Sequence, residues 1–263
     1  MKIATYNVNS VNARIDNLLS WLREEKTDIV LLQEIKTEYN TFPFFEFQTC
    51  GYNVCILGQK SYNGVAILSR GDIKVVSENL PDFTDEQARY LEADITLDNE
   101  IFRVASVYLP NGNPPYNDAS DTSKFEYKLR WMDAFLTHMR KLSLLPQPVV
   151  VGGDFNVIMT DKDIYDPKLF AGNALFRPEV RSRLQQLSFC GFYDAFRSLH
   201  PDENGYTFWD YTGNALAADF GMRIDYIYLS APAADRLLSC RVDKKPRQAA
   251  KPSDHTPLIA ELS

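Results

Sequence analysis

Short runs of strand-forming residues recur from one end of the chain to the other, and this pattern constrains the fold most. Apolar runs such as 28–32 and 148–152 are typical of buried strands. The runs between residues 52 and 108 follow one another with no helical pattern between them, which favours antiparallel hairpins over an all-parallel sheet. Strands are predicted at residues 2–8, 28–33, 52–57, 64–69, 72–79, 90–97, 101–108, 148–152, 224–229 and 256–262.

Helical periodicity is limited to a few segments. Residues 13–26 and 124–142 carry apolar side chains at helical spacing, and a third helix is predicted after Pro178, because proline suits a first helical turn. We expect these helices to cover the outside of two packed sheets, which makes the fold α/β. With 263 residues, 45% of them hydrophobic, the chain can bury the core of one domain spanning residues 1–263.

Composition narrows the cellular setting. The chain has no run of about 18 apolar residues, and its start lacks the charged and apolar regions of a signal peptide, so neither a membrane nor secretion is expected. The four cysteines form no CxxC pair and have no zinc-ligand spacing to the three histidines. We therefore expect reduced thiols in a cytoplasmic protein, associated with the nucleoid if the source is bacterial.

The formal net charge of −7 argues against a general polyanion binder, because nucleic-acid binding normally shows as a basic domain or stripe. Net charge says nothing about one face, however, and carboxylates that converge on a divalent cation form an anion-binding centre once the cation is bound. Basic side chains around such a centre are then expected. The candidates are Lys124, Lys128, Arg130, Lys244, Lys245, Arg247 and Lys251, with a solvated charged face as the alternative.

Six polar clusters stand where strand-forming runs stop. They occupy residues 6–9, 32–36, 108–112, 153–156, 223–226 and 253–255. Any one of them alone can be a turn or a solvated strand end. Because ligands favour the ends of strands in α/β sheets, we expect the six clusters to form one shared site.

The residue types in the clusters indicate a class of chemistry. Glu34 supplies a hard oxygen ligand at the end of a strand, and Asp154 and Asn156 stand two residues apart and can point the same way. Asp225 and His255 are the pieces of a carboxylate-oriented imidazole. The clusters contain no serine or cysteine nucleophile beside a base. Metal-assisted hydrolysis of a phosphodiester fits this inventory.

As an ordered set, the clusters resemble the exonuclease III type of abasic-site (AP) endonuclease, within the wider endonuclease/exonuclease/phosphatase group that includes deoxyribonuclease I. The resemblance covers essentially the whole chain. It implies a four-layered α/β sandwich, in which two mainly antiparallel sheets pack face to face between helices and the site lies at one edge. It also implies cleavage of DNA on the 5′ side of abasic sites in base excision repair, with 3′-phosphodiesterase and 3′ to 5′ exonuclease activity. The implied partner is double-stranded DNA with abasic or 3′-blocked damage, and the implied state is a monomer.

The resemblance also implies roles for individual residues around a Mg²⁺ or Mn²⁺ ion. Glu34 is the main metal ligand, with Asn7 and Asp254 nearby. Asp154 orients or deprotonates the attacking water with help from Asn156, and both are further candidates for metal ligation.

Other residues match groups that act on the phosphate or on DNA. His255 matches the donor to the scissile phosphate and Asp225 its support, while Tyr108 matches a further contact to the phosphate or leaving oxygen. Lys36 supports Glu34. The residues that match DNA contacts or the pocket for a flipped abasic sugar are Asn111, Asn173, Phe208, Trp209, Met222 and Ile224. For Trp209 and Ile224, a place in the core is an equal alternative.

Three departures from the family pattern bear on the substrate. Met222 stands where some relatives have an aromatic, which implies a looser pocket, and Asn9 stands where some have aspartate. The loop 112–123 also differs, and Tyr116 is our hypothesis for a side chain that wedges into DNA. The alternatives are a phosphodiesterase of the same group acting on RNA, inositol phosphates or phospholipid headgroups, and a non-catalytic binding scaffold.

Overall fold

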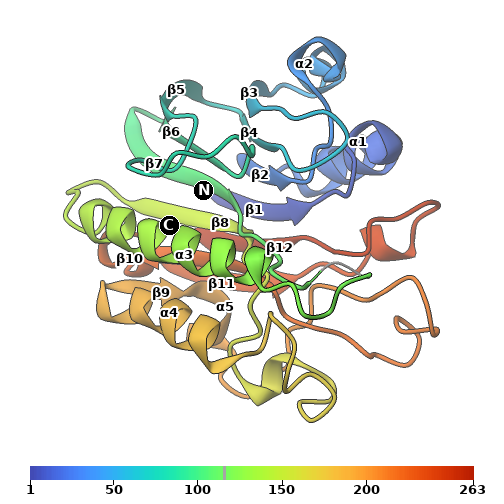
Figure 1. The fold of residues 1–263 in the computed structure, drawn as a ribbon. Coiled ribbons are helices and arrows are strands. Elements are labelled where there is room, and N and C mark those ends of the chain that lie inside the picture. The colour runs from blue at the N-terminus through green and yellow to red at the C-terminus, as the bar shows by residue number, and fades with distance from the viewer. Residues whose placement is uncertain (115–116) are drawn as a thin grey trace.

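The protein is described by a computed structural model that covers residues 1–114 and 117–263, so the hypothesis on Tyr116 lies outside the described residues (Figure 1). Two six-stranded sheets form its centre. The first sheet has the order β11 (Leu237–Val242), β12 (Leu258–Leu262), β1 (Lys2–Asn7), β2 (Ile29–Gln33), β4 (Val65–Ser69), β3 (Asn53–Leu57). The second has the order β5 (Asp72–Ser77), β6 (Tyr90–Leu97), β7 (Glu100–Tyr108), β8 (Val149–Asp154), β10 (Asp225–Ser230), β9 (Phe192–Asp194).

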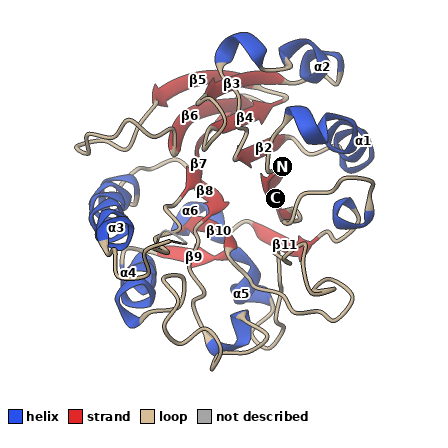
Figure 2. Ribbon diagram, turned by 45° about the vertical axis from the view of Figure 1, so that its right-hand side comes forward, coloured by secondary structure: helices blue, strands red, loops and turns tan. Residues whose placement is uncertain are grey.

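Helices lie outside the two sheets (Figure 2). They are α1 (Ile15–Glu25), α2 (Phe44–Thr49), α3 (Ser123–Leu142), α4 (Pro178–Phe189), α5 (Ala195–Leu199) and α6 (Ala231–Ala234), with the 3₁₀ turns η1 (Asn12–Arg14), η2 (Tyr39–Thr41), η3 (Asp161–Asp163) and η4 (Pro246–Gln248). None of the helices in the described part of the chain is long and apolar enough to cross a membrane. All four cysteines are free thiols.

The apolar residues sort into layers that follow from the alternation of side chains along strands. Leu31 on β2, Val104 on β7 and Ile227 on β10 meet between the sheets. The other face of the first sheet packs on α1 and α2. The other face of the second sheet packs on α3 and α4. The predicted four-layered sandwich is therefore confirmed.

The predicted strands agree with the observed ones to within two residues at every boundary. The hairpins β3–β4, β5–β6 and β6–β7 are antiparallel, as expected, whereas β1–β2 and β7–β8 are parallel. The sequence patterns missed β9, β11, α2, α5 and α6. These elements are short, and β11 contains a register shift between Leu237 and Ser239, so they lack a sustained period.

The topology brings the six polar clusters to one edge. Parallel pairing places the ends of β1 and β2 together, with Asn7 opposite Gln33. Parallel pairing of β7 with β8 places Tyr108 opposite Asp154, and the antiparallel start of β10 adds Asp225 opposite the same residue. The antiparallel pairing of β12 with β1 places the segment before β12 at this edge too.

Candidate active site

Two carboxylates at the ends of β2 and β8 are held together by one amide. The Asn7 Nδ2 donates to Glu34 Oε1 at 2.8 Å and to Asp154 Oδ2 at 2.9 Å. Lys36 Nζ lies 2.8 Å from the other Glu34 oxygen, so the predicted support of Glu34 by Lys36 is present in the structure. Asn7 and Asp154 are 0% and 1% exposed, so the hydrogen bond between them is shielded from water.

The backbone turns sharply where these side chains are presented. Glu34, Lys36, Asn9 and Asn156 have φ values of 50°, 53°, 45° and 47°, in the left-handed region. For residues other than glycine this conformation is uncommon, and it concentrates at functional sites because the surrounding structure must enforce it. Asparagine tolerates it best, whereas Glu34 has no such preference, so the surrounding structure must hold its backbone in this conformation.

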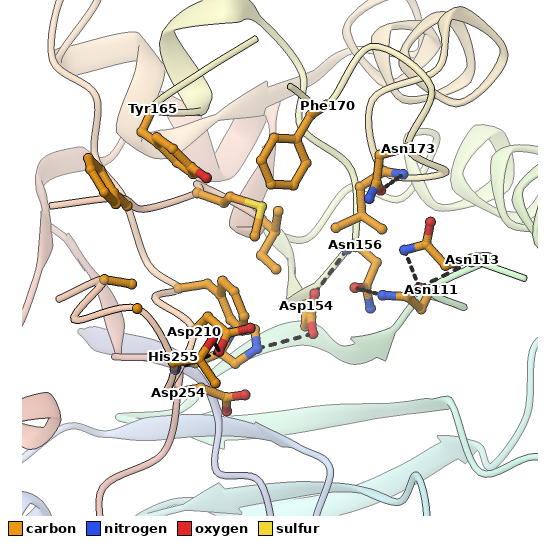
Figure 3. A pocket seen from close by; sticks show the side chains of 18 of the residues that line it. Asn111, Asn113, Asp154, Asn156, Tyr165, Phe170, Asn173, Asp210, Asp254 and His255 are labelled. Atoms are coloured by element: carbon orange, nitrogen blue, oxygen red, sulfur yellow. Dashed lines mark hydrogen bonds and ion pairs between the residues drawn. The ribbon is translucent and has the colours of Figure 1, made fainter. Parts of the chain in front are cut away.

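An imidazole completes the polar group. His255 Nδ1 lies 2.8 Å from Asp225 Oδ2, so this nitrogen carries a proton and donates it to the carboxylate. His255 Nε2 then faces Asp154 Oδ2 at 3.7 Å (Figure 3). Phe208 packs edge-on against the imidazole with ring centroids 4.9 Å apart. Thr207 Oγ1 donates to Asp225 and holds that carboxylate in place.

The carboxylates and the imidazole shift one another's protonation. Burial raises the pKa of Asp154 to about 7, with Asp225 and Glu34 adding to the increase against the effect of His255. Burial lowers the pKa of His255, but Asp225 and Asp154 outweigh it and raise the pKa to about 10. Burial likewise raises the pKa of Glu34, yet Lys36 and the Asn7 hydrogen bond hold it below its usual range. At neutral pH the site therefore holds an ionised Glu34, a protonated His255 and an Asp154 able to exchange a proton.

Neutral hydrogen-bond donors line the opposite side. Burial, with Glu34 and Asp154, raises the pKa of Tyr108 well above its ordinary value, so its phenol keeps its proton. The Asn156 backbone N–H donates to Asp154 Oδ1 at 2.9 Å. The Asn156 side chain accepts from Asn111 Nδ2 at 3.2 Å and donates to the Leu109 carbonyl at 2.9 Å. These contacts fix which end of each amide faces the site.

These groups open into one cavity of about 510 Å³ (Figure 3). Its polar lining is Glu34, Tyr108, Asn111, Asn113, Asp154, Asn156, Asn173, Asp210, Thr212, Asp254 and His255. Its apolar lining includes Tyr165, Phe170, Leu175, Phe208, Phe220, Met222 and Ile224. A cavity with convergent polar groups of shifted pKa beside an apolar wall is the usual form of an active site.

The sequence profile of the endonuclease/exonuclease/phosphatase family matches residues 4–255, nearly the full chain and every group described above. The chain belongs to this family. Exodeoxyribonuclease III of Haemophilus influenzae is 31% identical over 270 aligned positions that cover 100% of both chains. Among solved structures, an AP endonuclease from Archaeoglobus fulgidus is 35% identical with a TM-score of 0.92, covering 100% of this chain and 99% of its own. A 3′ phosphatase from Neisseria bound to a product DNA hairpin is 35% identical with a TM-score of 0.89, again covering 100% and 99%. The chain is thus an exonuclease III-type nuclease.

Members of this family depend on a metal, and the donor set here suits a divalent cation. One ligand atom each from Glu34, Asp154 and His255 lies within 4.8 Å of the others. The two carboxylates would hold the cation, whereas the protonated His255 has no lone pair to offer and would lie beside it as a donor. Carboxylate oxygens are the ligands that Mg²⁺ and Mn²⁺ prefer, and a cation would offset the charge of these two neighbouring carboxylates. Asn7 uses its amide nitrogen to brace them, while its Oδ1 accepts from the Asn9 backbone at 3.0 Å. Asp254 accepts from Asn9 Nδ2 at 3.0 Å and lies at the side of this group.

The structure places most of the predicted DNA contacts on the cavity wall. Asn111, Asn173, Phe208, Met222 and Ile224 all line it. For Trp209 the core alternative holds in place of a DNA contact, because its side chain is fully buried and its Nε1 donates to Asp219 Oδ1 at 3.1 Å. The ring supports the wall from behind and presents no surface to DNA.

The expected basic rim also needs a correction. Lys128 is 0% exposed and Arg247 is 7% exposed, so neither belongs to a solvated rim, whereas Lys124 and Lys244 are exposed. Arg247 instead donates to the buried Trp209 carbonyl at 3.0 Å. Lys124, Lys128 and Arg130 all have apolar neighbours in the sequence of α3. Their spacing therefore does not reveal which of the three side chains faces the interior.

Sequence reasoning missed part of the cavity wall. Asn113, Tyr165, Phe170 and Phe220 line the cavity, and three of the four are aromatic. Tyr165 stacks on Phe220 with ring centroids 4.8 Å apart and meets Phe170 edge-on at 5.8 Å. The available signal was the length of the segment 157–178, because long loops in compact domains tend to be functional.

Proposed function

We propose that this protein is a Mg²⁺-dependent DNA-repair nuclease that hydrolyses the phosphodiester on the 5′ side of abasic sites and also removes 3′-blocking groups and nucleotides. The observation that carries the proposal is the group of a half-buried Glu34 with the buried Asp154 and His255 in one cavity with an apolar wall. The two similar solved structures, an AP endonuclease and a 3′ phosphatase, support both halves of the proposal.

Hydrolysis of a phosphodiester requires the site to offset negative charge, because the phosphate repels an approaching hydroxide. A divalent cation held by Glu34 and its neighbours would supply Lewis-acid stabilisation of that charge. Asp154, with its pKa raised to about 7, accepts a proton from the attacking water once it is itself deprotonated. The Asn156 N–H bond to its other oxygen keeps the accepting oxygen oriented.

His255 serves the phosphate. Its Nδ1 is committed to Asp225 at 2.8 Å, which leaves the Nε2–H free to donate into the cavity. The raised pKa keeps this proton in place at neutral pH, so the imidazolium adds a positive charge where the transition state gains negative charge. The protonated phenol of Tyr108 and the amides of Asn111 and Asn173 provide further donors to the same cavity.

The apolar wall selects the nucleotide. Phe208, Met222 and Ile224 form a surface that fits a flipped sugar, and flipping costs least where no base is stacked or paired. Tyr165, Phe170 and Phe220 extend this surface with three aromatic rings. Because bases stack on aromatic faces, this extension favours removal of base-bearing 3′-terminal nucleotides as a second activity of the same site.

Double-stranded DNA is the proposed partner. Lys124 is exposed on α3 and lines a neighbouring hollow together with Asn111 and Asn113, and Lys244, Lys245 and Lys251 are exposed near the end of the chain. Lysines that hold phosphates release counterions on binding, so affinity for duplex should fall steeply with salt. A flat salt response would point to a small-molecule phosphoester.

One assay tests the proposal. Wild-type protein is incubated with duplex carrying a single abasic analogue, with intact duplex, and with a nick bearing a 3′ phosphate, in Mg²⁺ or in EDTA. We expect Mg²⁺-dependent cleavage of the abasic strand and release of the 3′ phosphate, and loss of both in His255→Ala. Asp161→Asn, a change at an exposed aspartate, is the matched control and should cleave like wild type. Tight binding without cleavage of any duplex would identify a scaffold instead.

A further inference from the structure

A lysine on α3 is buried behind the catalytic cavity. Lys128 is 0% exposed, although Lys124 and Arg130 on the same helix are exposed. Its Nζ donates to three main-chain carbonyls, those of Asn156 at 2.6 Å, Asn111 at 2.9 Å and Ala174 at 3.2 Å. Lys128 forms no ion pair with a carboxylate among residues 1–114 and 117–263.

The chemistry of an ammonium matches this arrangement. A protonated lysine has three N–H donors and no acceptor, and here each donor has one carbonyl. Burial lowers the pKa of Lys128 to about 7, with Asp154 acting against the decrease, whereas three surrounding carbonyls suit only the protonated form. Burying a charge is costly unless it is fully hydrogen-bonded, and well-packed apolar residues often give equal or greater stability than a buried charge. Stability alone therefore does not account for a lysine at this position.

The three carbonyls belong to three separate segments that line the cavity. One follows β7 and contains Asn111, one follows β8 and contains Asn156, and one precedes α4 and contains Asn173 next to Ala174. These segments are not neighbours in sequence. Main-chain hydrogen bonds link them only in pairs, from Leu109 N–H to the Asp154 carbonyl at 2.9 Å and from Ile158 N–H to the Leu175 carbonyl at 2.8 Å. The single ammonium contacts all three.

Side-chain amides link the same segments on the cavity side. Asn111 Nδ2 donates to Asn156 Oδ1 at 3.2 Å, and Asn113 Nδ2 donates to Asn111 Oδ1 at 2.8 Å. Asn113 Oδ1 accepts from the Ala174 backbone N–H at 3.1 Å. These asparagine side chains line the cavity (Figure 3). Lys128 is not part of the lining and bonds instead to the main chain of the same segments.

Close contact with a glycine shows how tightly the lysine is enclosed. Gly112 has φ +83°, and a Cβ at this position would lie 2.6 Å from Lys128 Cδ and 3.3 Å from its Cβ. The loop after β7 therefore runs against the lysine stem itself. Any larger residue at position 112 would displace either the loop or the lysine.

We propose that Lys128 is a positioning residue for phosphodiester hydrolysis, whose ammonium sets the relative placement of the segments that carry Asn111, Asn156 and Asn173. This inference rests on the proposed function, since it concerns the rate of that reaction. Asn156 in turn holds Asp154 through its backbone N–H, so a shift of the segment after β8 moves the water-activating carboxylate. Misplacement of a reacting group by about 1 Å can cost on the order of 10²-fold in rate.

The test compares two lysines on one helix. Lys128→Met keeps the length and apolar stem and removes the donors, while Lys141→Met removes an exposed lysine of α3 paired with Asp82 and is the matched control. We expect kcat on abasic duplex to fall about 10²-fold in Lys128→Met with KM changed less than about threefold, because the phosphate-facing surface remains. Lys128→Gln, which keeps two N–H donors, should recover part of the loss. Lys141→Met should match wild type.

A double-mutant cycle separates positioning from a loss of folded protein. If Lys128 acts through Asn156, the Lys128→Met and Asn156→Ala losses in kcat should not add, and the double variant should resemble Asn156→Ala. Additive losses, an unchanged kcat in folded Lys128→Met, or failure of both position-128 variants to fold at 25 °C would each overturn the proposal. If wild type itself does not cleave, it is the proposed function that fails, and this is visible before any variant is made.

Discussion

The two buried aspartates Asp154 and Asp163 have carboxyl pKa values that are shifted in opposite directions. Asp154 at the end of β8 is 1% exposed, and Asp163 in η3 is 0% exposed. Burial raises the pKa of Asp154 to about 7, helped by neighbouring carboxylates. Burial also raises the pKa of Asp163, but Arg223, with Thr160 and Arg197, outweighs it and holds that pKa below its usual range.

The partners explain the difference. Asp163 Oδ1 accepts from Arg223 Nε at 2.6 Å and from Arg197 Nη2 at 2.7 Å, so its charge is fully compensated. Asp154 receives neutral donors from Asn7 and Asn156, and the nearest charged nitrogen, His255 Nε2, is 3.7 Å away. Equal burial therefore accompanies a structural ion pair in one case and, in the proposed function, a reactive carboxylate in the other. The distinguishing feature of the site is incomplete compensation, which a substrate and a cation can relieve.

The largest effect is expected at the reactive aspartate. Asp154→Asn should lower kcat on abasic duplex by about 10³- to 10⁴-fold, because it removes the proton acceptor. The same variant should unfold at an equal or higher temperature than wild type in EDTA at pH 8, since an uncompensated buried charge is gone. Steady-state kinetics and thermal unfolding measure the two quantities. A large loss of stability in this variant would contradict the comparison.

The opposite outcome is expected at the structural aspartate. Asp163→Asn should lower the free energy of unfolding by about 3 kcal/mol, because it leaves Arg223 and Arg197 buried with an incomplete partner. At a temperature where the variant is folded, its kcat should stay within about threefold of wild type. Chemical denaturation gives the first number. A loss of activity as large as that of Asp154→Asn would mean that the two aspartates act as one unit.

The two aspartates should affect the pH dependence of the free energy of unfolding with opposite signs. Asp163 has a depressed pKa, so its contribution is present above the unfolded pKa of about 3.9 and is lost as pH falls through its folded pKa. Asp154 has a raised pKa, so stability from its bound proton is lost as pH rises from about 4 to about 7. In EDTA, the advantage of Asp154→Asn over wild type should therefore be largest above pH 7 and vanish near pH 4. An advantage that does not change with pH would show that packing, not charge, is responsible.

The sequence predicted the strands and their shared edge well because both follow from local patterns. Continuous apolar runs define β2 and β8, and polar residues must begin where those runs leave the core. Parallel pairing of the first two strands and antiparallel return of the last then bring the clusters together without any further information. The residue types at the strand ends, read as an ordered set, identified the family.

What sequence could not show is which charged side chains face inward. Arg223 stands in the same cluster as Asp225, yet it turns to Asp163 and Asp194, 2.6 Å from each, and serves the structural ion pair. Lys128 has the same helical surroundings as Lys124, and only the packing of three distant segments over α3 makes it buried. These assignments depend on contacts between segments far apart in the chain, which a residue pattern does not encode.

The smallest expected effect is a difference between wild type and the two variants in the stability that they gain on binding Mg²⁺. Wild type in EDTA should gain stability when Mg²⁺ is added, by about 1.4 kcal/mol at roughly ten times its dissociation constant. Asp154→Asn should lose part of this gain, because a neutral amide attracts the cation less. Asp163→Asn should keep the gain in full on its lower baseline, since its side chain is committed to arginines and threonine. Thermal unfolding of the three proteins across a Mg²⁺ titration measures the gains, with Ca²⁺ as a second hard cation. An equal gain in all three proteins would place the cation away from Asp154, with Glu34 binding it together with other ligands. The raised pKa of Asp154 would then serve proton transfer alone.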